Sequence, residues 1–275
     1  MSLIRIGHTP DADDAFMFYG ISSGKVKMDG YSLQHVVEDI ESLNRKAFDE
    51  VLEVTAISAH AYSYLADKYF ILSTGASMGM GYGPIVVTKK MQSIDELRGK
   101  TIAIPGKYTT AALLLDMAVK DIKTVEANFD SIPDLVLGGK VDGGILIHEG
   151  QLTYQSLGLA KVLDLGEWWD KESHGLPLPL GLDTSRKDLG EEFAKSFNEV
   201  FRKSVQERYA NKDNALKYAM EFARGQDAEL VDKFVSMYVN ELTLDMGTKG
   251  KDALKLLYQK ASQDGLIPET DPIII

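Results

Sequence analysis

The 275-residue sequence contains no cysteine. Disulfide bonds, thiolate nucleophiles and cysteine-ligated zinc sites are therefore excluded. It also lacks any run of about 18 apolar residues, the length that a membrane-spanning helix needs. The start of the sequence shows no basic segment followed by an apolar stretch, so we expect no signal peptide. These absences predict a soluble, cytoplasmic protein with no membrane partner.

Positive charge is scarce. Lysine and arginine number 30 against 41 aspartates and glutamates, which gives a formal net charge of −11. A protein that binds nucleic acid or an anionic membrane needs a basic surface, so we expect neither partner. The negative net charge does not exclude a small anionic ligand, because one local site can be positive inside an acidic protein.

Hydrophobic residues make up 44% of the chain, enough for a substantial core. Short apolar runs alternate with helical patterns, which is typical of βαβ units and an α/β fold. Residues 3–7, 52–58 and 101–106 read as strands, and residues 40–50 and 109–120 read as helices. After residue 183 the apolar spacing becomes strongly helical.

The middle of the chain reads as an α/β unit inserted into another one. We expect lobe one to comprise residues 1–89 and 181–275, and lobe two to comprise residues 90–180. The chain would cross between lobes near Lys89 and near Leu180. Two crossings predict two hinge strands and a cleft, and ligand sites favour such interfaces.

Polar residues follow several of the predicted strands. In open α/β sheets, ligands bind outside the carboxyl ends of the strands, where helix N-termini also point. The residues at these junctions are His8, Thr9, Asp11 and Asp14 in the first loop, Ser58, then Gly106, Thr109 and Thr110, and finally His148 and Glu149.

Most of these residues also fit a helix N-cap, and both roles stay open. Asp11, Asp14, Ser58, Thr109 and Thr110 all carry suitable oxygens. Capping and ligand binding are compatible, because a helix N-terminus has unused backbone N–H groups that can bind a carboxylate. Several such termini in one cleft would bind a carboxylate without an arginine.

His148 follows the apolar residues of the segment "GGILIHEG". This segment has no helical periodicity that would place the histidine on the exposed face of a helix. Its ring would project into the cleft and could take up and return a proton near neutral pH. A structural histidine is the alternative. We expect the adjacent Glu149 to point to the other side of an extended chain, so another group must hold the second ring nitrogen. His60 lies close to Ser58 in sequence and is a candidate neighbour of the site.

Other common active-site patterns are missing. The sequence has no HExxH motif, no cluster of His, Asp and Glu at metal-ligand spacing and no G-x-S-x-G elbow. We therefore predict no metal site.

Four motifs together, "PGKYTTA", "GILIHEGQLTY", "DLGEWW" and "GLPLPLG", carry a resemblance. With them the sequence resembles the 1,4-dihydroxy-6-naphthoate synthases, which cleave cyclic dehypoxanthinyl futalosine on the futalosine route to menaquinone. The similarity covers nearly the whole chain. It implies a two-lobed fold like that of type II periplasmic binding proteins, with a central cleft and two hinge crossings, and a lyase reaction that needs no cofactor.

The resemblance also implies roles for individual residues. The histidine after the "LIxHE" strand is the catalytic base of this family, and it matches His148. The first loop departs from a familiar family form, "SPCPNDTF", and reads "HTPDADDAF" here, so that only its proline and Asp14 clearly correspond. The remaining residues matched to the substrate pocket are Ala56, Ile57 and Ser58 on one lobe and Thr109 and Thr110 on the other.

Two alternatives stay open. Chorismate dehydratase of the same pathway also takes a carboxylate-bearing substrate, although the His-Glu motif favours the synthase. A solute-binding protein for a small carboxylate would share the fold but return its ligand unchanged. In each case the partner is a small-molecule carboxylate, and the sequence indicates no oligomeric state.

Overall fold

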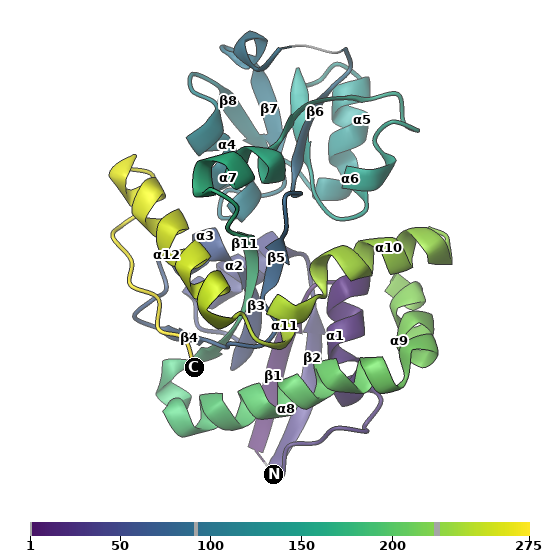
Figure 1. The fold of residues 1–275 in the computed structure, drawn as a ribbon, viewed down its shortest axis with the longest axis vertical. Coiled ribbons are helices and arrows are strands. Elements are labelled where there is room, and N and C mark those ends of the chain that lie inside the picture. Colours follow the sequence, from purple (N-terminus) through teal and green to yellow (C-terminus); the bar gives the residue numbers. More distant parts are fainter. Residues whose placement is uncertain (1, 91–92, 223–225) are drawn as a thin grey trace.

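Two separate β-sheets, each with its own helices, organise the chain. The computed structural model describes residues 2–90, 93–222 and 226–275. In Figure 1 one sheet with its helices lies above the other along the longest axis. This arrangement gives the two lobes that the sequence predicts.

The first sheet combines parallel strands from the start of the chain with a returning antiparallel strand. Strands β1 and β2 are parallel, as are β1 and β3, whereas β11 runs antiparallel to β3. All five residues of β3 are buried, as in a strand covered on both faces. The strand order is β2 (Tyr31–Val37), β1 (Ser2–His8), β3 (Val54–Ser58), β11 (Leu178–Arg186) and β4 (Tyr69–Ile71), and β5 (Ser77–Gly79) also pairs with β11.

The second sheet repeats this topology. Its strand β7 is parallel to β8 and β9, and β6 runs antiparallel to β9 and β10. In the first sheet β3 pairs with the antiparallel strand β11, and in the second sheet β9 pairs with the antiparallel strand β6. Both β11 and β6 follow a crossing between the lobes. The order is β10 (Ala160–Asp164), β6 (Ile85–Thr88), β9 (Gly143–Leu146), β7 (Thr101–Ile104) and β8 (Lys123–Glu126).

The first crossing lies a few residues earlier than expected. The predicted boundary places residues 85–88 in lobe one, but β6 pairs with β9 and β10 of the second sheet. All four residues of β6 are buried, and such an apolar strand carries no sequence signal for the sheet it joins. We therefore call residues 2–79 and 178–275 the first lobe and residues 85–173 the second lobe.

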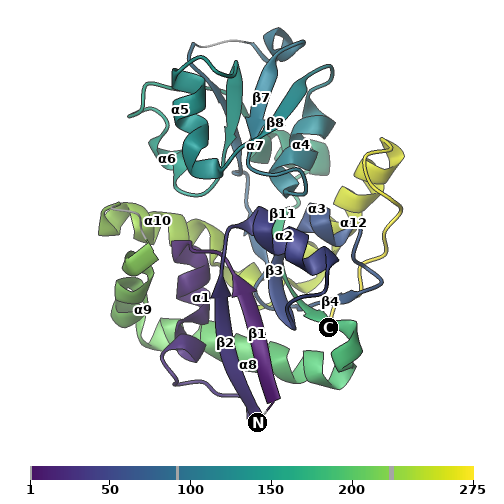
Figure 2. The same ribbon diagram turned by 180° about the vertical axis from the view of Figure 1, so that it is seen from behind.

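Helices cover both sheets. In the first lobe, α8 crosses in front of the sheet in Figure 1 and behind it in Figure 2, whereas α2 lies on the opposite side. The first-lobe helices are α1 (Ala12–Ser22), α2 (Ile40–Phe48), α3 (Ala59–Tyr62), α8 (Glu191–Ala210), α9 (Lys212–Ala219), α10 (Ala228–Tyr238), α11 (Glu241–Leu244) and α12 (Gly247–Gln263). The second-lobe helices are α4 (Thr110–Ala118), α5 (Ile132–Leu137), α6 (Gly150–Thr153) and α7 (Leu165–Ser173).

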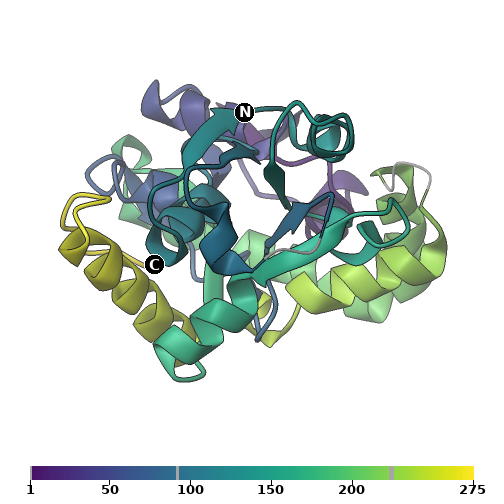
Figure 3. The ribbon, with the colours of Figure 1, turned by 90° about the horizontal axis from the view of Figure 1, so that it is seen from above.

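Seen from above, the C-terminal helices flank the molecule on two sides. In Figure 3 the yellow α12 lies on one side and the yellow-green α10 on the other. No helix within the three described ranges combines the length and apolar character that crossing a bilayer requires.

Helix α1 is buried almost all round, which fixes the loop before it. Phe18 stacks on Phe201 of α8, with ring centroids 4.4 Å apart. A Cβ on Gly20 would come within 2.7 Å of the Ser204 backbone, so a larger residue would separate the two helices. The Ser204 hydroxyl also donates a hydrogen bond to the carbonyl of Met17 at 2.8 Å. This packing gives the N-terminus of α1 a rigid support.

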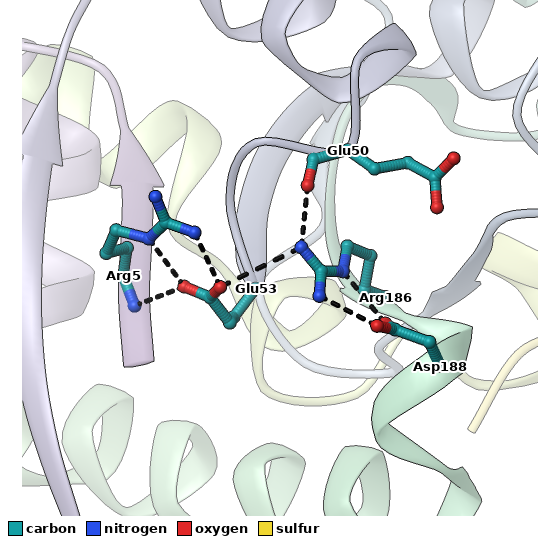
Figure 4. Close-up of polar contacts among 5 residues, drawn as sticks. All are labelled: Arg5, Glu50, Glu53, Arg186 and Asp188. Carbon is teal, nitrogen blue, oxygen red and sulfur yellow. Dashed lines mark hydrogen bonds and ion pairs between the residues drawn. The ribbon is translucent and has the colours of Figure 1, made fainter. Parts of the chain in front are cut away.

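An ionic network joins β1, the loop before β3 and the end of β11 (Figure 4). Arg5 of β1 donates to both carboxylate oxygens of Glu53, at 2.9 and 2.7 Å. Arg186 of β11 lies 3.8 Å from Glu53 and donates to the carbonyl of Glu50 and to the carboxylate of Asp188. The network ties β1, the start of β3 and the end of β11 together.

Candidate active site

A pocket lies between the lobes and encloses about 730 Å³ of space, part of it open to solvent. Clefts between lobes are common sites for small-molecule ligands. The residues predicted for the site and found in its lining are Asp14, Ala56 and Ser58 from the first lobe and Thr109, Thr110 and His148 from the second.

Ile57 is the exception. Side chains alternate along β3, so Ala56 and Ser58 line the pocket while Ile57 points into the hydrophobic core, where it is fully buried. Its side chain therefore supports the strand and does not line the pocket.

The N-terminus of α4 meets the pocket. Thr109 caps this helix: its hydroxyl accepts from the N–H of Ala112 at 3.3 Å and donates to the carbonyl of Gly106 at 2.8 Å. Within the described part of the chain, no backbone hydrogen bond engages the N–H of Thr110 or Ala111, and both residues line the pocket. The cap thus leaves N–H groups at the pocket to which an anion can bind.

Two neighbouring hydroxyls are held in place by other groups. Thr110 donates to the carbonyl of Leu180 at 2.7 Å and accepts from the His60 N–H at 3.2 Å, so it links the lobes. Ser58 accepts from the Asn44 amide at 3.0 Å, and the Asn44 oxygen accepts from the Ser58 N–H at 2.8 Å. Burial lowers the pKa of His60 to about 4, so His60 is neutral at pH 7. Asn44 is a supporting residue that the sequence pattern did not indicate.

His148 lies in a turn two residues beyond the end of β9. Its φ of 55° is left-handed, which is unusual for a residue with a side chain. Glu149 has φ −60° and ψ −20°, so the expectation that it points to the opposite side of an extended chain was wrong: the chain turns directly into α6. The His148 side chain is 16% exposed, lines the pocket and packs edge-on against Phe129.

The group beside the second ring nitrogen comes from the other lobe. Nδ1 of His148 lies 3.2 Å from Oδ2 of Asp11. Asp11 occupies the N-cap position of α1 but makes no side-chain capping hydrogen bond. Local sequence patterns did not reveal this pair, because 137 positions separate its members, from 11 to 148.

Gln151 braces the turn that carries His148. We orient the Gln151 amide so that its oxygen faces donors and its nitrogen faces acceptors. In this orientation the oxygen accepts from the His148 N–H at 3.2 Å. The amide nitrogen then donates to the carbonyl of Gly83 at 2.6 Å and to the hydroxyl of Tyr238 at 2.7 Å. Tyr238 belongs to the first lobe, so this chain of hydrogen bonds also spans the cleft.

Three aspartates give the pocket an unusual set of buried carboxyl groups. Burial raises the pKa of Asp14 to about 6, against the opposing effect of hydrogen bonds from the N–H and hydroxyl of Thr9 at 2.6 and 2.9 Å. Burial raises the pKa values of Asp13 and Asp183 well above the ordinary value. In both, Oδ1 has no hydrogen-bond partner among the described residues. Neutral carboxyl groups of this kind can donate hydrogen bonds to a ligand.

The lining contains neither lysine nor arginine among the described residues. A carboxylate here would have to bind to backbone N–H groups and hydroxyls. In the same ranges, no group of three or more His, Asp or Glu is placed to hold a metal ion.

Comparison with known proteins gives full-length matches. The family model described as "Menaquinone biosynthesis" matches residues 4–263. A protein of Thermus thermophilus named 1,4-dihydroxy-6-naphtoate synthase is 37% identical over the whole of both chains. A protein of the same name from Streptomyces coelicolor is 33% identical over 98% of this chain and 96% of its own.

Solved structures agree on the architecture. The protein AF1704 from Archaeoglobus fulgidus is 54% identical, with a TM-score of 0.92 over 96% of this chain and 98% of its own. A Candida albicans protein described as having the generic periplasmic binding protein fold is 14% identical, with a TM-score of 0.71 over 98% of this chain and 92% of its own. The two-lobed periplasmic-binding-protein fold expected from the sequence is confirmed.

Proposed function

This chain belongs to the menaquinone biosynthesis family, and from that premise and its pocket we propose that it cleaves cyclic dehypoxanthinyl futalosine to 1,4-dihydroxy-6-naphthoate. The names of its two full-length relatives support an enzyme with this product. The observation that carries the proposal is His148, held on a left-handed turn in the pocket between the lobes.

The carboxylate of the substrate binds at the N-terminus of α4. The N–H groups of Thr110 and Ala111 and the positive end of the helix dipole favour an anion there. Thr109 keeps this terminus ordered through its cap. This arrangement recognises a carboxylate without introducing a cation into the pocket.

His148 acts as the general base. Its Nε2 removes a proton from carbon in the cyclic, ribose-derived part of the substrate, and the C–H electron pair becomes a π bond as the bond to the leaving fragment breaks. The proton then returns from His148 to that fragment. The overall elimination is redox-neutral and forms a second aromatic ring, so we propose that it needs no cofactor.

Neutral carboxyl groups orient the oxygen-rich part of the substrate. Asp13 and Asp183 line the pocket, and each has a buried oxygen that can donate or accept a hydrogen bond once the carboxyl group is protonated. Hydroxyl groups of a sugar-derived ring match these carboxyl groups. Contacts from both lobes fix the reacting carbon relative to His148 and exclude water.

Incubation with cyclic dehypoxanthinyl futalosine, followed by mass spectrometry, tests the proposal. We expect the substrate to disappear and 1,4-dihydroxy-6-naphthoate to form at a rate proportional to enzyme concentration. Chorismate is incubated in parallel, and its dehydration would instead support the alternative enzyme. Tight binding with quantitative recovery of unchanged ligand would support a solute-binding protein and contradict the proposal.

A further inference from the structure

We propose that Asp11 is a positioning residue for His148, and that the approach of the two lobes assembles this pair. The inference rests on the proposed function, because it assigns a partner to the proposed base. It begins with the 3.2 Å distance between Oδ2 of Asp11 and Nδ1 of His148.

Asp11 departs from the ordinary role of an aspartate at its position. An N-cap aspartate normally accepts a hydrogen bond from the backbone of its own helix. Asp227 does so at the start of α10, where it accepts from the N–H of Leu230 at 2.8 Å. Asp11 makes no such bond at the start of α1, and its carboxylate reaches the second lobe. It is 1% exposed, so bulk water screens the pair weakly.

The backbone of His148 independently points to a fixed ring. A left-handed φ is unfavourable at a residue with a side chain and persists only where the surroundings enforce it. Gln151 holds the His148 N–H, and the Phe129 ring lies edge-on to the imidazole at 4.9 Å between centroids. The turn thus presents Nδ1 to Asp11.

A carboxylate at Nδ1 does two things for a base. It keeps the proton of the neutral ring on Nδ1, so that Nε2 carries the lone pair that accepts the substrate proton. It then stabilises the imidazolium that forms, because the positive charge appears beside a negative one. Asp11 itself gains and loses no proton.

The pair also links closure to chemistry. Asp11 belongs to the first lobe and His148 to the second, so separating the lobes would separate the two side chains. The base is then correctly oriented only when the cleft is closed around a ligand, which protects the open enzyme from unproductive proton transfer.

Nitrogen NMR on protein labelled with ¹⁵N-histidine tests the inference without any assay of turnover. The sequence has five histidines, and the signals lost in His148→Asn identify the ring. At a pH where the ring is neutral, and with the cleft closed by a saturating, non-reacting carboxylate analogue of the substrate, we expect wild-type His148 to carry its proton on Nδ1. We expect Asp11→Asn to move a large share of it to Nε2, because an amide can donate to Nδ1. A proton on Nε2 in the wild type would overturn the inference whether or not the enzyme turns over.

Kinetics supply the second readout. We expect Asp11→Asn to lower kcat at least about a hundredfold while KM changes less than about threefold, since the carboxylate contacts lie at α4. Asp227→Asn is the matched control: it makes the same change at an N-cap outside the pocket, where asparagine caps equally well, and should leave both constants unchanged. Wild-type kcat in a folded Asp11→Asn protein would contradict the positioning role. If wild type shows no turnover, the proposed function fails, while the tautomer result still decides the pairing.

Discussion

Asp183 of β11 lines the pocket, and its buried Oδ1 has no hydrogen-bond partner among the described residues. Burial raises the pKa of this carboxyl group well above 3.8, with a further contribution from the charge of Asp14. An unfolded chain releases the proton near pH 3.8, whereas the folded chain keeps it to a much higher pH. The group therefore costs stability progressively as the pH rises above 3.8.

Asp183→Asn should raise the stability of the fold at neutral pH. Asparagine has the same shape as aspartate but does not ionise. Its unfolded state is therefore not favoured by the loss of a proton. We expect a gain in stability near pH 7 that shrinks towards zero as the pH falls to 3.8. Urea denaturation across this pH range measures the gain. Equal stability of the two proteins at every pH would show that the carboxyl group is not protonated in the fold.

Thr109 tests the carboxylate site at the residue scale. Thr109→Val keeps the shape but removes the hydroxyl that caps α4, so the N–H groups at the helix start become less ordered. We expect substrate binding to weaken by roughly 1–3 kcal/mol, measured by calorimetry. Thr109→Ser keeps the hydroxyl and is the matched control, with affinity close to wild type. Unchanged affinity in the valine variant would move the carboxylate site elsewhere.

At the scale of secondary-structure elements, the ionic network around Glu53 connects strands of the first sheet (Figure 4). Burial acts to raise the pKa of Glu53, but the hydrogen bonds and charge of Arg5 outweigh it and lower the pKa. The ionised carboxylate therefore stabilises the folded chain. This contribution is complete above the ordinary value of 4.5 and is lost as the pH falls through the lower folded value.

Glu53→Gln should destabilise the protein without changing its chemistry. We expect a loss of roughly 1 kcal/mol at neutral pH, because the Arg5 guanidinium, whose side chain is 39% exposed, loses a charged acceptor that water replaces only in part. The difference from wild type should shrink as the pH falls below 4.5. Thermal denaturation at several pH values measures this loss. Turnover of the folded variant should equal that of wild type, since no residue of the network lines the pocket; a changed kcat would contradict that separation.

Many of the helices and strands could be predicted from the sequence. Helix α2 and strand β3 match the predicted segments 40–50 and 52–58 within a few residues, because apolar spacing and capping residues mark them locally. Sheet membership was harder: β6 was expected in lobe one, since no local signal tells a buried strand which neighbour it will pair with. His148 was found by its position after a strand, but Asp11 became its partner only through folding of the chain.

At the scale of the whole molecule, the pocket exists only where the lobes meet. Several side-chain contacts span them, among them Asp11 with His148, Tyr238 with Gln151, and Arg45 with Glu126, whose ion pair measures 2.8 Å. Two chain crossings, before β6 and before β11, provide the hinge. These contacts compete with solvent when the cleft opens, so a ligand that touches both lobes should favour the closed form.

Small-angle X-ray scattering tests this motion. We expect the radius of gyration to fall when a tight, non-reacting carboxylate analogue of the substrate saturates the protein. At the same total ligand concentration, the Thr109→Val variant should be only partly occupied. Its radius of gyration should therefore change less. A radius that is identical with and without saturating ligand, in a protein whose free form scatters as an open molecule, would contradict a closing hinge.

Single turnover of His148→Asn, measured beside substrate binding, tests the central claim most directly. Asparagine keeps some of the shape and hydrogen bonding of histidine but accepts no proton near neutral pH. We predict that 1,4-dihydroxy-6-naphthoate forms at least about a hundredfold more slowly than in wild type, while calorimetric affinity for cyclic dehypoxanthinyl futalosine changes much less. Near-normal turnover in the variant would contradict the account, because the proton would then be taken by another group.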